Sequence, residues 1–74
     1  MNSVTVVGVP GGDYECFCID VTAKEFERIK GEKPTKYDKS LDKKKYRIYP
    51  NDLMYKMGAE DGKKYEITLT MKEI

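Results

Sequence analysis

The sequence contains no histidine and no tryptophan among its 74 residues, and only two cysteines. Histidine is the side chain whose ordinary pKa lies closest to neutral pH, so its absence removes the commonest general base. It also removes every Ser-His or Cys-His nucleophile pair and the mixed Cys/His zinc sites. An enzyme would depend on carboxylates, lysine or tyrosine alone. We therefore expect that the chain is not an enzyme and has no catalytic residue, no cofactor and no metal site.

Long apolar runs are also missing. No stretch approaches the ~18–20 apolar residues that cross a bilayer, and the N-terminus lacks the basic region and cleavage site of a signal peptide. We therefore expect a cytoplasmic protein that does not enter the membrane. Cys16 and Cys18 flank Phe17 and share one face of a strand, which favours structural thiols over a disulfide. Metal or redox chemistry between subunits is the alternative for this pair.

Charge, by contrast, is plentiful and balanced. Charged residues make up 36% of the chain, with 14 basic against 13 acidic side chains. Val, Ile, Leu and Phe together form only ~20%, which is the border at which chains of high net charge fail to fold. A net charge of +1 removes that repulsion, and six tyrosines and four methionines add apolar bulk. We expect one domain over residues 1–74, with a stability of roughly 3–5 kcal/mol.

The N-terminal part has the pattern of a β-hairpin. Ser3 to Val9 is rich in β-branched residues and predicts a strand. Pro10 to Asp13 predicts a turn, and Tyr14 to Val21 the returning strand. A phosphate-binding loop is the alternative for the glycines near this turn, but such loops lead directly into a helix. This one leads into a strand, so we favour the hairpin.

A helix boundary follows directly. Thr22 and Glu25 have the spacing of a capping box, and Gly31 offers the left-handed conformation that ends a helix. We therefore predict a helix from Ala23 to Lys30. Its expected apolar face consists of Ala23, Phe26 and Ile29. Being barely two turns long, this helix needs to pack on a sheet to be stable.

The C-terminal half repeats strand and helix. Lys44 to Tyr49 predicts a strand, and a short helix that Gly58 ends is expected to begin at Pro50 or Asn51. Lys63 to Lys72 alternates strictly between apolar and polar residues, which is typical of a half-buried antiparallel strand. The predicted order is β-β-α-β-α-β. We expect an α+β fold with a four-stranded, mainly antiparallel sheet and one or two short helices.

Positive charge is concentrated between Lys33 and Arg47, which we call the basic segment. It holds seven basic against two acidic residues, a balance of +5 that leaves −4 for the rest of the chain. Much of it, about residues 32–43, is predicted to be a mobile loop. Lysines neutralise phosphates and aromatic rings stack on bases, as single-stranded nucleic acid requires. The candidate residues for this role are Lys36, Tyr37, Lys39, Lys43, Lys44, Lys45, Tyr46 and Arg47. A solvated loop is the alternative.

A second candidate surface surrounds the predicted second helix. Tyr49, Met54, Tyr55 and Met57 supply aromatic and thioether contact area of the kind found in protein interfaces. The alternative is that the methionines only dock the helix. Our leading hypothesis is a small non-enzymatic protein that occupies a surface of a protein partner, as phage-type accessory proteins do when they inhibit a host factor. RNA or single-stranded nucleic-acid binding is the alternative, and a homodimer through a sheet edge also stays open.

Overall fold

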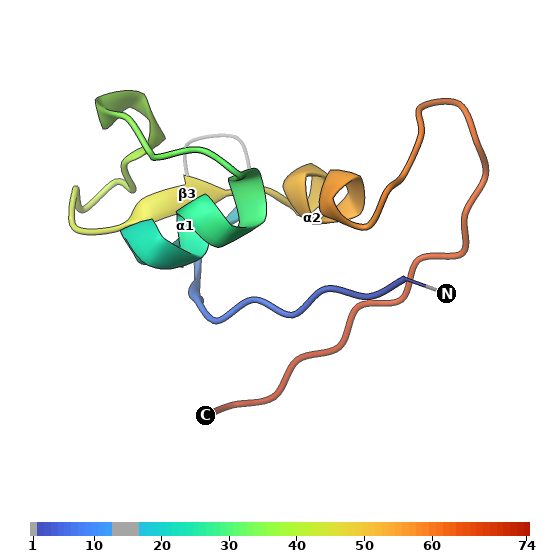
Figure 1. Ribbon diagram of the computed structural model, residues 1–74. Coiled ribbons are helices and arrows are strands. Elements are labelled where there is room, and N and C mark those ends of the chain that lie inside the picture. Colours follow the sequence, from blue (N-terminus) through green and yellow to red (C-terminus); the bar gives the residue numbers. More distant parts are fainter. Residues whose placement is uncertain (1, 13–16) are drawn as a thin grey trace.

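The computed structural model describes residues 2–12 and 17–74 and has an α+β fold (Figure 1). Within these residues an antiparallel sheet of three strands, in the order β1-β2-β3, carries two short α-helices. The strands are β1 (Val9–Gly12), β2 (Phe17–Val21) and β3 (Tyr46–Ile48); the helices are α1 (Ala23–Lys30) and α2 (Pro50–Lys56), with a 3-10 helix η1 (Lys36–Asp38) between them.

The hydrophobic core lies between α1 and the sheet. Its fully covered members are Val21, Phe26, Ile29 and Ile48. Five further side chains are partly buried against them: Val4, Val6, Ile19, Tyr46 and Leu53. Val21 precedes the helix cap and Phe26 lies in the first turns of α1, so the cap residues are held between two core side chains. With eight residues, α1 is too short to be stable in isolation. It therefore depends on packing against the sheet.

The predicted limits of α1 are confirmed. Thr22 caps the helix through its hydroxyl, which accepts a hydrogen bond from Glu25 N at 3.2 Å. Gly31 adopts φ 76° and donates its N–H to Glu27 O at 2.8 Å. Two expectations were wrong in detail: Ala23 is exposed, and the Glu25 carboxylate accepts from Val7 N at 3.1 Å, outside the helix cap.

The first strand begins later than the pattern predicted. β1 pairs with β2 in the expected antiparallel sense, yet it contains Pro10 to Gly12, which we had assigned to the turn. Close packing explains this use of glycine. A Cβ on Gly8 would lie 2.6 Å from Ile19 Cγ2, and one on Gly11 would lie 2.6 Å from Asp20 Oδ2. The predicted turn residue Asp13, and Tyr14 to Cys16 of the predicted strand, lie outside the described residues.

Residues 2–8 form an extended segment in place of the predicted strand, and side chains of α1 hold it. Arg28 Nη2 donates to Thr5 O at 2.6 Å, and the Glu25 carboxylate accepts from Val7 N. Val4 and Val6 are partly buried against the core. The predicted strand is therefore replaced by an extended segment whose Val4 and Val6 are partly buried while Val7 is exposed, and helix side chains take the place of a neighbouring strand as hydrogen-bond partners.

The predicted fourth strand, Lys63 to Lys72, is not formed. Residues 63–74 are all described, carry neither helix nor strand, and are all exposed. Leu69 is 77% and Met71 93% exposed. In Figure 1 the chain leaves α2 in a wide loop and returns as this extended segment, drawn in red. Alternation specifies two faces of a strand but not the strand it pairs with, and residues 2–12 and 17–62 provide no strand paired with this segment.

The remaining elements follow the sequence closely. β3 is shorter than the predicted Lys44 to Tyr49, with Ile48 buried and Tyr46 partly buried on the expected common side. Pro50 is the first residue of α2, and Gly58 follows the helix with φ 90°. The predicted loop contains η1, whose cap Thr35 accepts from Tyr37 N. Its mobility stays a prediction.

Candidate functional site

A partly buried apolar contact and an ion pair help to position α2. Leu53 packs against the core, while Lys30 of α1 lies 3.0 Å from the Asp52 carboxylate. Asp52 also accepts the Tyr49 N–H at 2.7 Å and thereby caps the helix. With Leu53 facing inward, Tyr55 faces solvent and is 55% exposed. The helix is held in place by these contacts and therefore presents the Tyr55 side chain to solvent from a fixed backbone position.

Tyr55 borders two shallow depressions. One is lined by Ile29, Lys30, Gly31, Asp52, Tyr55 and Lys56, between the two helices. The other lies between α2 and the chain that follows it, and its apolar lining is Met54, Tyr55, Ala59, Tyr65 and Ile67. The two depressions meet at one aromatic side chain, which is where a partner's side chains would find apolar contact on either flank.

Hydrogen bonds hold the outer wall of the second depression. The Tyr55 hydroxyl donates to Asp61 Oδ1 at 3.0 Å, and this bond raises the pKa of Tyr55. The Tyr65 hydroxyl accepts from Glu60 N, also at 3.0 Å. Both tyrosines are thus tied to the turn after α2 while their rings stay accessible. Asp61 and Tyr65 were not among the partner-binding residues predicted from the sequence.

The structure brings together only part of the partner surface predicted from the sequence. Met54 and Tyr55 share a depression, whereas Tyr49 is the partly buried cap of α2 and Met57 the residue at its other end. Tyr65 and Ile67 belong to the depression and were missed. Their alternation has the same appearance as a half-buried strand, so no sequence signal would have placed them here.

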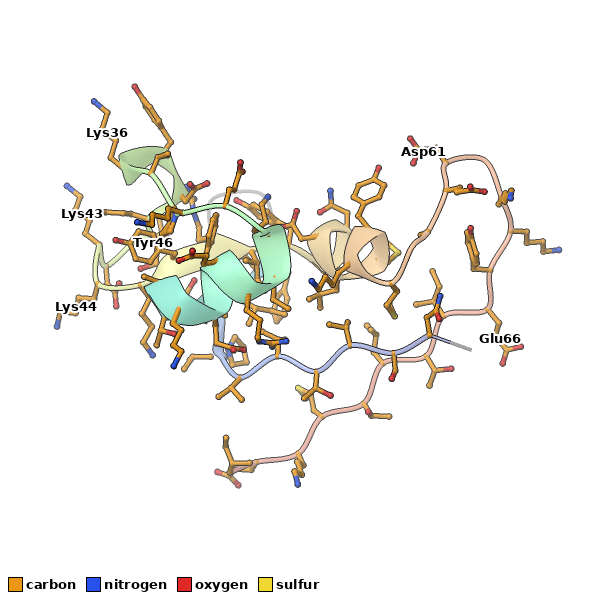
Figure 2. All side chains as sticks on the ribbon, viewed as in Figure 1. Lys36, Lys43, Lys44, Tyr46, Asp61 and Glu66 are labelled. Atoms are coloured by element: carbon orange, nitrogen blue, oxygen red, sulfur yellow. The ribbon has the colours of Figure 1, made fainter. Side chains whose placement is uncertain are left out.

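The basic segment folds around η1 and the outer side of β3. Arg47 of β3 donates from Nη2 to Tyr37 O at 3.2 Å, which holds η1 beside the strand. Tyr37 is 78% exposed, and the Lys36 ammonium lies 5.2 Å from its ring centre. Figure 2 shows Lys36, Lys43 and Lys44 projecting at the same end of the molecule. Lys39 is likewise exposed, at a bridge with Tyr46.

A buried serine organises the turn that carries Lys43 and Lys44. Ser40 is 3% exposed, and its hydroxyl donates to Asp42 and accepts from Lys45 N. Asp42 also accepts from Lys44 N at 2.9 Å, and these two bonds lower the pKa of Asp42. Lys43 adopts φ 61°, the left-handed region. The lysines of this turn are therefore displayed by a defined hydrogen-bond network.

Tyr46 serves the core. Its ring lies 6.1 Å from that of Phe26 in an edge-to-face arrangement at 60°, and it is partly buried. Lys45 and Arg47 are likewise only partly exposed. Of the aromatic residues proposed to stack on bases, Tyr37 alone has an open ring in this segment, so the basic segment offers cations more readily than a stacking platform.

The cysteine and cofactor expectations meet the structure in different ways. Cys18 is fully buried in β2 and its thiol lies 3.6 Å from Asp20 Oδ1, as expected of a structural thiol. Cys16 lies outside the described residues, so the pair stays a prediction. In residues 2–12 and 17–74, no group of His, Cys, Asp or Glu side chains is arranged to hold a metal ion. No helix in this part of the chain is long and apolar enough to span a membrane.

Comparison with known proteins gives no relative. No protein-family model matches the chain, and neither the curated proteins nor the solved structures contain a significant match.

Proposed function

We propose that the protein is a non-enzymatic module that binds a protein partner through the surface around Tyr55. The observation that carries this proposal is the position of Tyr55, which is half exposed on a fixed helix and borders two depressions at once. Exposed tyrosines on a rigid base contribute large contact area at low entropic cost and are frequent binding hot spots.

The neighbours of Tyr55 support a protein partner. Met54 adds a flexible thioether, and Tyr65 and Ile67 extend the apolar surface beyond the helix. Charged groups surround this apolar centre, among them Lys30, Lys56 and Asp61. An apolar centre with a polar rim is the usual composition of a protein interface. Leu53 already provides the contact that docks α2, so Tyr55 is not needed for that purpose.

The test compares two exposed tyrosines. A partner is first identified by affinity capture from the source cells and mass spectrometry, and its affinity is then measured with purified components. Tyr55→Ala should weaken this binding by well over 1 kcal/mol and leave the melting temperature unchanged. Tyr37→Ala, at the opposite end of the molecule, is the matched control and should change neither. If both variants bind like the wild type, the Tyr55 surface is not the site.

Nucleic-acid binding is a second candidate, because Tyr37 and Lys36 present an open ring and a cation side by side. Binding to single strands would weaken with salt, each neutralised phosphate contributing a slope near −0.7 in log K against log salt. Replacing Lys43, Lys44 and Lys45 by Ala should flatten that slope by about 2 units. Fluorescence anisotropy with labelled oligonucleotides measures it, and no binding at low salt refutes the candidate.

A further inference from the structure

The C-terminal segment, residues 64–74, leaves a complete apolar strand face in solvent. Tyr65, Ile67, Leu69 and Met71 alternate with polar residues, and all of them are exposed. Figure 2 shows Glu66, on the polar side of this segment, pointing outward. An extended apolar segment with an unpaired backbone is a ready template for pairing with another strand. The described residues therefore include an extended segment that is not paired with another strand.

The edges of the molecule's own sheet are poorly suited to accept it. The outer edge of β3 is already engaged at one end, where Lys39 forms a bridge with Tyr46. β1 contains Pro10, which has no N–H to donate to a neighbouring strand. These two edges explain why the predicted fourth strand stays apart from the sheet.

We propose that residues 66–72 pair with the same segment of a second copy of this chain, antiparallel and with the two-fold axis at Leu69. In this register Glu66 lies opposite Lys72 of the other copy, and the symmetry repeats the pair. Thr68 lies opposite Thr70, and on the apolar face Ile67 lies opposite Met71. Opposite charges, threonine pairs and apolar pairs are the cross-strand contacts that stabilise a sheet.

Charge complementarity selects this register over its neighbours. A two-fold axis at Thr68 would place Lys64 opposite Lys72, and one at Glu66 would place that carboxylate opposite itself. An axis at Ile67 would leave Glu66 facing a threonine. An axis between two residues would put polar residues opposite apolar ones, because residues directly opposite share a face. Within residues 66–72, the register centred on Leu69 pairs Glu66 with Lys72 and places every apolar residue opposite another apolar residue.

This inference shares Ile67 with the Tyr55 surface but involves neither Tyr55 nor α2, so Tyr55→Ala separates the two proposals. A ribbon of two strands is only marginally stable by itself. We therefore expect a weak dimer whose formation depends on protein concentration. The polar face is open to water, so salt should weaken its ion pairs.

The experiment is a charge exchange between two copies, followed by sedimentation equilibrium. Lys72→Glu places Glu opposite Glu66, and Glu66→Lys places Lys opposite Lys72, each at two symmetric positions. Either variant alone should dimerise about tenfold more weakly, since two contacts turn from attractive to repulsive. An equimolar mixture of the two should regain the wild-type affinity, because every lysine then faces a glutamate. Lys24→Glu, on the exposed side of α1, changes the net charge equally and should have no effect.

Three results would overturn the inference. The first is a wild-type protein that stays monomeric up to millimolar concentration. The second is a mixture that dimerises as weakly as the single variants, which would mean that Glu66 and Lys72 do not face each other. The third is a dimer lost with Tyr55→Ala but unchanged in the charge variants, which would move self-association to α2. A failure of partner binding alone would leave this inference standing.

Discussion

The two ends of the chain, residues 2–8 and residues 63–74, have similar sequences in one respect and opposite environments. Both were predicted to be strands, and both are extended without belonging to a strand of the sheet. At the N-terminal end Val4 and Val6 are partly buried against the core. At the C-terminal end Leu69 and Met71 lie in solvent.

The difference comes from the polar partners available to each backbone. Glu25 and Arg28 lie one turn apart on α1. The Glu25 carboxylate accepts a hydrogen bond from Val7 N, and the Arg28 guanidinium donates one to Thr5 O. The Asn2 side chain donates to Met57 O at 2.7 Å and anchors the segment a second time. These hydrogen bonds lie at the exposed surface and fix the backbone of the segment beside α1, where Val4 and Val6 reach the core. In the C-terminal segment, Leu69 and Met71 have no such anchoring contacts among the described residues and stay exposed.

The largest expected effect tests the core on which the N-terminal segment packs. Phe26→Ala should cost about 3–5 kcal/mol, close to the whole stability of a domain this small. The variant should therefore be largely unfolded by circular dichroism. Phe17→Ala removes the same side chain at a position that is 70% exposed and should cost about 1 kcal/mol or less. Equal losses in the two variants would place the core elsewhere.

An intermediate effect is expected from the side chain that fastens the N-terminal segment. Glu25→Gln removes the charge that binds both Val7 N and Arg28, and should reduce the free energy of unfolding by about 1 kcal/mol. Glu66→Gln makes the same change on the C-terminal segment and should have no measurable effect at low protein concentration. Urea denaturation of both variants measures the difference, and an effect at position 66 alone would reverse the comparison.

The pH dependence gives an independent measure of the same contact. Hydrogen bonds from Arg28 and from Val7 N lower the pKa of Glu25 from 4.5 to about 2. Because the folded pKa is the lower one, the stabilisation is complete above about pH 4.5 and is lost as the pH falls toward 2. The stabilities of wild type and Glu25→Gln should therefore converge over this range. A constant difference down to pH 2 would contradict the assignment.

The smallest effect is expected at the C-terminal segment itself. Leu69→Ala should change the stability of the isolated chain by no more than about 0.5 kcal/mol, because the side chain contacts mainly water. Val6→Ala, in the N-terminal segment, removes partly buried surface and should cost about 1 kcal/mol. Thermal melts at low concentration keep the copies apart. A loss from Leu69→Ala larger than that from Val6→Ala would mean that the C-terminal segment is packed.

The two candidate surfaces were predicted from the sequence to different extents. Tyr55 was identified from the helix that contains it, and its exposure follows from Leu53 facing the core. Tyr37 and the lysines around it were identified by charge alone. Tyr46 shows the limit of that reasoning, because a tyrosine ring can either stack on a nucleic-acid base or pack in a hydrophobic core. Its edge-to-face contact with Phe26 shows that it packs against the core. Tyr65 joined the Tyr55 surface only because its strand did not form.

Local chemistry in the sequence was sufficient for both helices and their ends. Thr22 and Gly31 limit α1, Pro50 and Gly58 limit α2, and each acts on backbone groups within a few residues along the chain. Strand pairing is different, because the partner of a strand is remote in sequence and alternation carries no information about it. Only the tertiary structure shows that the backbone at Gly8 and Gly11 approaches β2 too closely for a side chain. It also shows that α1 side chains bind residues 2–8 and that residues 63–74 are exposed.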